Sequence, residues 1–307
     1  MIPFVLILLA GQTDPMSPSS VEDVVVEGVR DAARAYVAET VRPRRRGQPV
    51  AQIARWAAPV CVRVIGPERA SARAMEAGVM ETLKTLDVPT AADRCTPNAV
   101  IVVTDRSAEF SERVARRRRF ALFANNAAAI QTFVEPAAKM RWMHRITQGG
   151  DEAPGSMSLT TDAQGGEPGG AATPAGRTMF SGGGQGAIIA LPHSRIDLST
   201  EAQIDRAMIV IDTEVAETAP RQPLIDYLAY TVAVDRADTS GPGGGGVLSL
   251  IGSEGLRDPS AVLTDQDISF VRALYASDDR RSASMQGVDI INRMERQARE
   301  REAARTD

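Results

Sequence analysis

The spacing of apolar positions along the chain predicts alternating helices and strands. Apolar residues recur at helical spacing over 20–41 and 70–86, and each segment therefore reads as an amphipathic helix. The run Ala99–Thr104 is continuously apolar and rich in β-branched residues, which is typical of a buried central strand. The same criteria predict further helices at 107–118, 223–234, 264–275 and 287–305, and strands around Cys61 and at 187–191 and 208–211. Thr264, with Asp267 three residues on, is predicted to cap the helix at 264–275. This alternation predicts an α/β or α+β fold in which helices flank a mixed sheet.

A glycine-rich stretch interrupts this pattern. Residues 149–184 contain 11 of the chain's 25 glycines, with Pro, Ser and Thr between them. The segment has too little apolar surface to offset the conformational entropy that ordering it would cost. We therefore interpret it as a loop or hairpin insertion, and a domain linker is the alternative interpretation. The expected organisation is a signal peptide and linker at 1–19, one globular domain at 20–277, and a charged C-terminal helix and tail at 278–307.

The N-terminus has the features of an export signal. Ile2–Ala10 is apolar but shorter than the roughly 20 residues that span a bilayer. Small residues and a Pro/Ser-rich stretch follow it, as in a secretory signal peptide, although no Lys or Arg precedes it. A buried N-terminal strand is the alternative. No later stretch is long and apolar enough to predict a transmembrane helix, so we expect a periplasmic or secreted protein.

The only two cysteines fit that compartment. Cys61 lies in a predicted strand and Cys95 lies just ahead of another, so a bond between them would close a loop of about 35 residues. Disulfides persist in oxidising compartments, whereas two free thiols would be expected in a cytoplasmic protein. We predict a Cys61–Cys95 disulfide.

Charge gives little indication of a partner. The 35 basic and 39 acidic residues leave a net charge of −4, which does not favour nucleic acid as a ligand. Two arginine clusters are expected to be solvated, although either could contact an anionic envelope polymer or lipid head group. Their members are Arg44, Arg45, Arg46, Arg116, Arg117, Arg118 and Arg119.

Neither histidine belongs to a metal-binding pattern. His144 and His193 are the only two in the chain, and neither has a second histidine three or four residues away. His193 is a weak catalytic candidate without a supporting nucleophile motif, and His144 is expected to be hydrogen-bonded or half-exposed. Gly241–Gly246 satisfies a dinucleotide-binding string, but no strand precedes it and no helix follows, so it is a chance match. We predict no cofactor and no metal.

Two carboxylates occupy positions where α/β proteins often place functional groups. Asp105 and Asp212 each follow an apolar strand, at the carboxyl end. They are weak catalytic candidates, and the alternative is that they cap the turns that follow.

Two stretches resemble a family of uncharacterised exported bacterial proteins whose domain is related to zincin-like metallopeptidases. The resemblance rests on Val262–Asp267 followed by Phe270–Tyr275 and Met285, which is similar to L-T-x-x-D…L-R-x-L-Y…G-M. It implies that 224–229 occupies the place of the zinc-binding H-E-x-x-H helix. Ile225 and Ala229 would then replace the two ligands and Asp226 the general base. Since Ile and Ala cannot bind zinc, the resemblance implies a degenerate site, whereas the residues alone favour an ordinary amphipathic helix.

The sequence therefore suggests an exported envelope protein that is not an enzyme and serves binding or structure. The alternative is a hydrolase with a non-zinc mechanism that acts on envelope material through Asp105, Asp212 or His193.

Overall fold

The computed structural model describes residues 21–41, 52–92, 94–118, 122, 127–149, 201–236, 246–252 and 255–306. Its main sheet is built around β3 and β5, which run parallel over six residue pairs. On the other side of β3 lies β2, also parallel, and β4 pairs antiparallel with β5. The short β1 runs parallel to the first residues of β5. The strands are β1 Arg55–Trp56, β2 Val62–Ile65, β3 Ala99–Thr104, β4 Met140–Gly149 and β5 Glu201–Asp212, with a separate pair β6 Ile251–Gly252 and β7 Gly255–Leu256.

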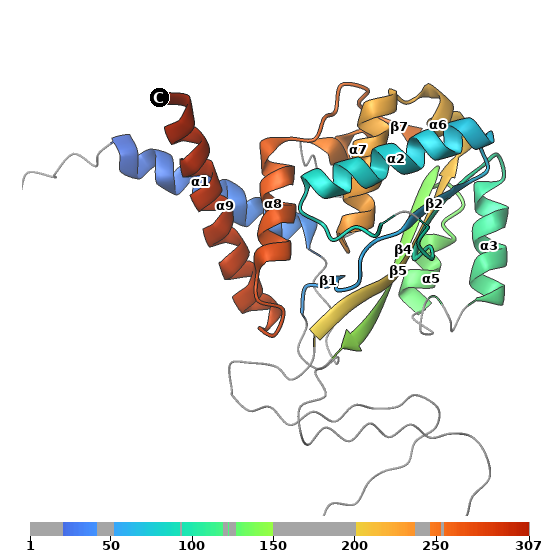
Figure 1. Cartoon of the computed structure of the whole chain (residues 1–307), viewed down its shortest axis with the longest axis horizontal. Helices are drawn as coiled ribbons and strands as arrows, with labels where there is room; N and C mark the ends of the chain where they lie inside the picture. The colour runs from blue at the N-terminus through green and yellow to red at the C-terminus, as the bar shows by residue number, and fades with distance from the viewer. Residues whose placement is uncertain are drawn as a thin grey trace, which may run out of the picture.

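Helices cover both faces of the sheet (Figure 1). On one face α2 Arg69–Thr85 and α7 Arg221–Ala233 pack over the strands, and on the other lie α3 Ser107–Arg117 and α5 Ala127–Phe133. α1 Val21–Thr40, α8 Asp265–Ala276 and α9 Ala283–Thr306 lie beside the β1 end, and α6 Thr213–Thr218 leads from β5 towards α7. The described part of the chain also contains a short 3-10 helix, η1 Val247–Ser249.

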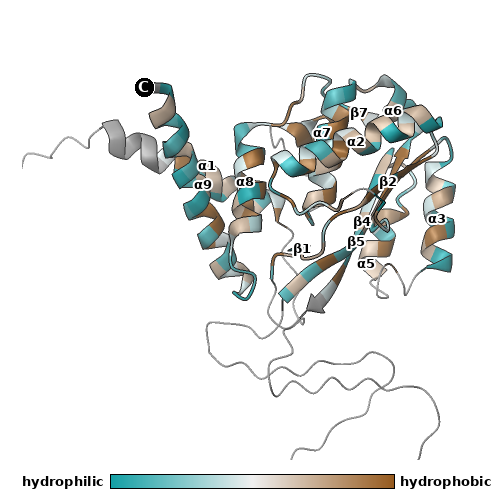
Figure 2. Ribbon diagram, in the orientation of Figure 1, coloured by the Kyte–Doolittle hydropathy of each residue, from teal (hydrophilic) through white to brown (hydrophobic). Residues whose placement is uncertain are grey.

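Two hydrophobic cores follow from this layering. The larger core lies between the sheet and α2, α7 and α8, and the smaller lies under α3 and α5 around Phe133, Met143 and Val210. Apolar positions are concentrated in β2 and α7, whereas many positions on the outer helices are polar (Figure 2). β3 supplies both cores because its successive side chains point to opposite faces: Ile101 belongs to the larger core and Val102 to the smaller.

The predicted fold class is confirmed: a sheet with parallel strands is flanked by helices. The predicted helices at 20–41, 70–86 and 107–118 match α1, α2 and α3 within one residue at either end. The apolar piece after Gly246 begins as the 3-10 turn η1 and continues into β6. The sequence reading missed β4, although Met140, Trp142 and His144 alternate with Arg141, Met143 and Arg145 along it.

The predicted disulfide is confirmed. Cys61, immediately before β2, is bonded to Cys95, and their Cα atoms are 6.0 Å apart. The bond therefore ties the start of β2 to the segment that leads into β3. Asn98 supports the same junction, because its side chain accepts from the Cys61 N–H and donates to the Pro59 carbonyl.

Several predictions concern residues outside the described part of the chain. These are the signal segment 1–19, the strand at 187–191, and nearly all of the insertion at 149–184. Within the helices that the structure describes, none combines the length and apolar character that a bilayer-spanning helix requires.

Candidate functional site

The carboxyl ends of β3 and β5 carry a partly buried polar cluster. The Ser107 hydroxyl, at the start of α3, donates to Asp212 Oδ2 over 3.2 Å. Arg141 Nη1 donates to the same hydroxyl over 3.0 Å, and Lys139 Nζ lies 3.9 Å from Asp212 Oδ2. β3 and β5 end side by side, and the antiparallel β4 begins at that edge, so three segments distant in sequence meet here.

Arg141 is the most deeply buried charge of this cluster, with 2% of its surface exposed. Burial lowers its pKa, while the nearby Asp212 and Glu135 carboxylates oppose that shift. The guanidinium also donates to the carbonyls of Glu135 and Pro136 after α5. The Arg141 guanidinium thus bonds both to the turn before β4 and to the start of α3, and its role is structural.

Asp212 itself is the N-cap of α6. Its Oδ1 accepts from the Glu214 N–H over 3.1 Å, while Oδ2 accepts from Ser107. Both carboxylate oxygens are therefore engaged in holding α6 and α3 against the sheet. The structure favours the capping alternative for this residue.

Asp105 does not join the cluster. Its side chain is 81% exposed and lies beside Arg106, at a distance of 4.0 Å. The two carboxylates that follow strands thus differ in environment: Asp212 is held by hydrogen bonds, and Asp105 faces solvent. The third catalytic candidate of the sequence, His193, lies outside the described residues.

The three positions compared with a zinc helix lie on α7 against α2. Ile225 and Ala229 are buried, and a Cβ added to Gly78 of α2 would lie 2.7 Å from Ile225 Cδ1. Asp226 Oδ1 accepts from Thr82 Oγ1 of α2 over 3.0 Å, and also from Gln222 Nε2. Ile225 and Asp226 therefore contribute to the packing of α7 on α2, and Ala229 is buried in the larger core. Among the described residues, no three His, Cys, Asp or Glu side chains cluster in a way that could hold a metal ion.

The expectation for His144 is wrong. Its side chain is 1% exposed, and neither ring nitrogen has a hydrogen-bond partner among the residues that the structure describes, although Nδ1 lies 3.7 Å from Asp235 Oδ1. The neighbouring Arg236 stacks 3.8 Å above the Trp142 ring and donates to the Tyr227 hydroxyl. Trp142 and His144 point to one face of β4, and the residues that follow α7 lie against that face.

A second buried carboxylate, Asp267, joins four segments. Its Oδ2 accepts from the Val247 N–H and from the N–H and hydroxyl of Thr264, and Oδ1 accepts from the Tyr36 hydroxyl over 2.5 Å. Gly246 adopts a φ of +84°, and a Cβ there would lie 2.4 Å from Asp267 Oδ2. The Thr264–Asp267 capping box predicted from the sequence is confirmed, and the structure adds α1 and the Gly246 turn to it.

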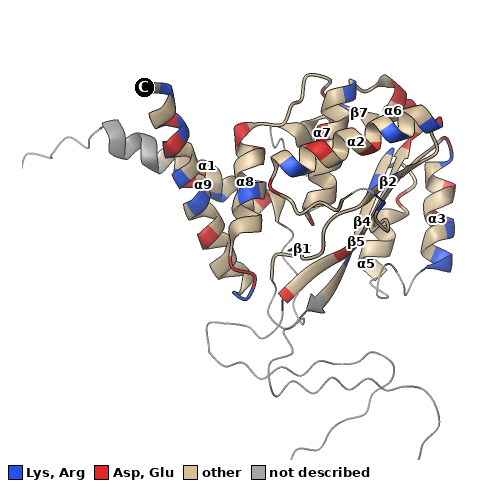
Figure 3. Ribbon diagram, in the orientation of Figure 1, with Lys and Arg blue, Asp and Glu red and all other residues tan. Residues whose placement is uncertain are grey.

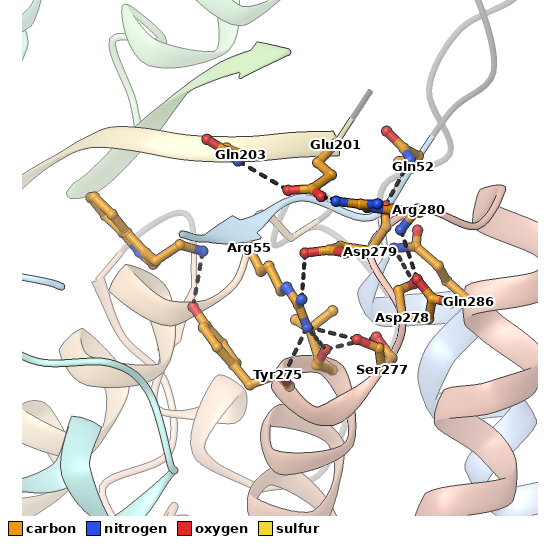
Figure 4. A network of polar contacts seen from close by, with 12 residues as sticks. Gln52, Arg55, Glu201, Gln203, Tyr275, Ser277, Asp278, Asp279, Arg280 and Gln286 are labelled. Atoms are coloured by element: carbon orange, nitrogen blue, oxygen red, sulfur yellow. Dashed lines mark hydrogen bonds and ion pairs between the residues drawn. The ribbon is translucent and has the colours of Figure 1, made fainter. Parts of the chain in front are cut away.

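A polar network fastens β1 to the C-terminal end of α8 (Figure 4). Arg55 donates to the carbonyls of Tyr275 and Ser277 and pairs with Asp279. Positive charge at a helix C-terminus complements the exposed carbonyls of the last turn. The remaining residues of the network extend it to α9 and to the start of β5: Gln52, Glu201, Gln203, Asp278, Arg280 and Gln286.

The arginine cluster of α3 is exposed, as predicted. Arg116, Arg117 and Arg118 lie on the surface at the end of this helix, where basic positions gather (Figure 3). Arg119 and the second cluster, Arg44 to Arg46, lie outside the described residues.

No family model, curated protein or solved structure matches this chain.

Sequence reasoning missed Ser107, Lys139 and Arg141, which complete the cluster around Asp212. Ser107 could have been suspected, because a serine three residues after a buried strand is a common helix-start residue. The sequence around Arg141 contains no motif that would have indicated its role. Its importance depends on the pairing of β4 with β5, which brings it within reach of Ser107.

Proposed function

We propose that this chain is an exported, disulfide-closed envelope protein that serves binding or structure rather than catalysis. In this proposal it is a degenerate relative of zincin-like metallopeptidases. Support comes from the Cys61–Cys95 disulfide, which suits an oxidising compartment. It comes also from Ile225 and Ala229, whose side chains are buried in the larger core.

The observation that carries the proposal is the engagement of Asp212. A general base or nucleophile needs a carboxylate oxygen directed at substrate. Asp212 Oδ1 instead accepts from the first turn of α6, and Oδ2 from Ser107. Ser107 in turn accepts from Arg141, so its hydroxyl is held between a donor and an acceptor. The arrangement stabilises the junction of β3, β4 and β5.

The test compares two aspartates that both follow a strand. Asp212→Asn removes the charge beside Arg141 and Lys139, and we expect it to lower the free energy of unfolding by about 1–3 kcal/mol. Asp105→Asn is the matched control, and its exposed side chain predicts a change within about 0.5 kcal/mol. Urea titration followed by circular dichroism measures both.

The rival hypothesis is a hydrolase with a non-zinc mechanism. It predicts that hydrolysis of isolated envelope material by the purified chain falls with Asp212→Asn or Asp105→Asn while stability is unchanged. Such a result would contradict the proposal, as would one equivalent of zinc per chain measured by elemental analysis of the purified protein.

As part of the same proposal, Arg116, Arg117 and Arg118 supply the binding surface for anionic material. Their exposure at the end of α3 supports this role. Contacts through exposed arginines weaken as salt screens them, and the Debye length is about 10 Å at 0.1 M. Association that survives molar salt would exclude these residues as its main cause.

A further inference from the structure

The structure shows a groove on the face of the protein that carries the α3 arginines. It lies between α3 and α5 and has a volume of about 600 Å³, within the range typical of small-molecule sites. The lining comprises Glu112, Ala115, Arg116, Ala127, Ile130, Gln131 and Val134.

The floor of the groove is apolar. Ile130 and Val134 are partly buried against the smaller core, and Ala115 belongs to that core. The small side chains of Ala115 and Ala127 leave space between the two helices where larger residues would fill it. An aliphatic chain placed here would be removed from water, which favours binding in proportion to the apolar surface that is buried.

The α3 side of the groove is basic at its C-terminal end. Arg116 lines the groove and pairs with Glu112 at 3.4 Å, and Arg113 pairs with Glu109. Within the described part of the chain, the exposed Arg117 and Arg118 have no ion-pair partner. An anionic group at this end of the groove would therefore meet positive charge that no carboxylate of α3 neutralises.

We infer that the α3–α5 groove binds a single anionic amphiphile, with its aliphatic chain on the Ala115–Ile130–Val134 floor and its acidic head at Arg116–Arg118. A free molecule fits better than a bilayer surface. The apolar lining is limited to the space between the two helices, and two carboxylates of α3 would repel a continuous anionic surface: Glu112, which also lines the groove, and Glu109. This inference rests on the proposed binding role and gives it a ligand class.

The probe is sodium decanoate below its micelle concentration, titrated into the full chain by isothermal calorimetry. We expect saturable binding of one decanoate per chain and much weaker binding of decanol, which has the same chain length without the charge. Arg117→Gln with Arg118→Gln should weaken decanoate binding about 2- to 30-fold, as expected for two exposed charge contacts. The matched control is Arg221→Gln with Arg296→Gln, two exposed arginines on α7 and α9, which should leave it unchanged.

A second pair of variants tests the groove itself. Ala127 is exposed on the first turn of α5, so Ala127→Phe should place a ring in the groove without disturbing either core and abolish decanoate binding. Ala35→Phe, at an exposed position of α1, is the control and should bind as the native chain does. Thermal unfolding of each variant checks that the fold is retained.

The inference is overturned if decanoate does not saturate a single site, or if Ala127→Phe binds it unchanged. It is also overturned if the chain binds phosphatidylglycerol vesicles but not free decanoate. Hydrolytic turnover of envelope material would refute the proposed non-catalytic role separately, because that readout does not depend on the groove.

Discussion

At the scale of single residues, two buried charged groups of this protein are each held by several hydrogen-bond partners. Asp267 has no exposed surface and accepts four hydrogen bonds, and Arg141 is clamped among Ser107 and two carbonyls. Removing one partner from such a group leaves a desolvated charge unpaired, which costs more than the bond itself contributes. Mutations at these residues should therefore act on stability.

Asp267→Asn tests this at the junction of α1, α8 and the Gly246 turn. The amide presents two donors where the carboxylate accepted from Val247, Thr264 and Tyr36, so we expect a loss of about 3 kcal/mol in unfolding free energy. Asp265→Asn is the control, because Asp265 is exposed in the first turn of the same helix and should cost less than about 1 kcal/mol. Urea denaturation measures both, and equal effects would contradict the central role of Asp267.

Alkaline pH tests the tyrosine beside Asp267. Burial, and then Tyr230 and Asp267, raise the pKa of Tyr36 well above its ordinary value of 10.0. In the unfolded chain this tyrosine ionises near pH 10, but in the fold it stays protonated. The contribution of Tyr36 to the free energy of unfolding is therefore fully present below about pH 10 and declines as the pH rises further.

Burial likewise raises the pKa values of Tyr230 and Tyr275, so several tyrosines share this dependence. Tyr36→Phe should reduce the slope of unfolding free energy against pH, above about pH 10.5, by up to about 1.4 kcal/mol per unit. Urea titrations between about pH 9 and 11.5 give both slopes. Identical slopes for the native chain and Tyr36→Phe would show that Tyr36 ionises without cost in the fold.

At the scale of elements, local signals decide where helices and strands begin, and cross-links decide how they are joined. The disulfide joins the start of β2 to the approach to β3, and Arg55 joins β1 to the end of α8. The disulfide and the Arg55 contacts each join segments that backbone hydrogen bonds within helices and strands do not connect.

Replacing both cysteines with alanine should therefore lower the unfolding free energy substantially. With a sequence separation of 34 between the two cysteines, the chain-entropy relation gives about 4 kcal/mol. Guanidinium denaturation of Cys61→Ala with Cys95→Ala against the native chain measures the loss. A thiol assay on denatured, unreduced protein is the companion measurement: two reactive thiols per chain would refute the disulfide.

At the scale of the whole molecule, the charged C-terminal helix α9 contributes side chains to the larger hydrophobic core. α9 begins at Ala283, four residues before the predicted start, and Ile290 and Met294 are buried in the larger hydrophobic core. Most charged residues of α9 lie on the sides of the helix that do not carry Ile290 and Met294. The sequence predicts a charged C-terminal helix and tail, and the helix packs against α8 and α1.

Ile290→Ala measures how far α9 stabilises the domain. Removing a fully buried side chain should cost about 2–5 kcal/mol. Val288→Ala, two residues away and 50% exposed, should change the unfolding free energy by less than about 1 kcal/mol. A single unfolding transition monitored by two probes would show that α9 unfolds with the sheet, whereas an early separate transition would make it an independent element.

Elements whose signals are local could be predicted from the amino-acid sequence. The β-branched run of β3, the helical spacing of α2 and the Thr264–Asp267 capping box each depend on residues a few positions apart. The disulfide was also predictable, because only one pair of cysteines exists and it spans two strand starts. Periodicity and capping report the local environment, so these predictions needed no knowledge of neighbours in space.

The roles of the polar residues depend on contacts between segments that are distant in the sequence. Arg141, Ser107 and Asp212 meet because β4 pairs with β5 and β5 with β3. Asp212 and Asp105 stand in the same sequence context, yet one caps α6 and the other faces solvent. Strand order and the packing of α7 on α2 arise from contacts between distant segments. Burial and hydrogen-bond partners therefore cannot be read from the neighbours of a residue in the chain.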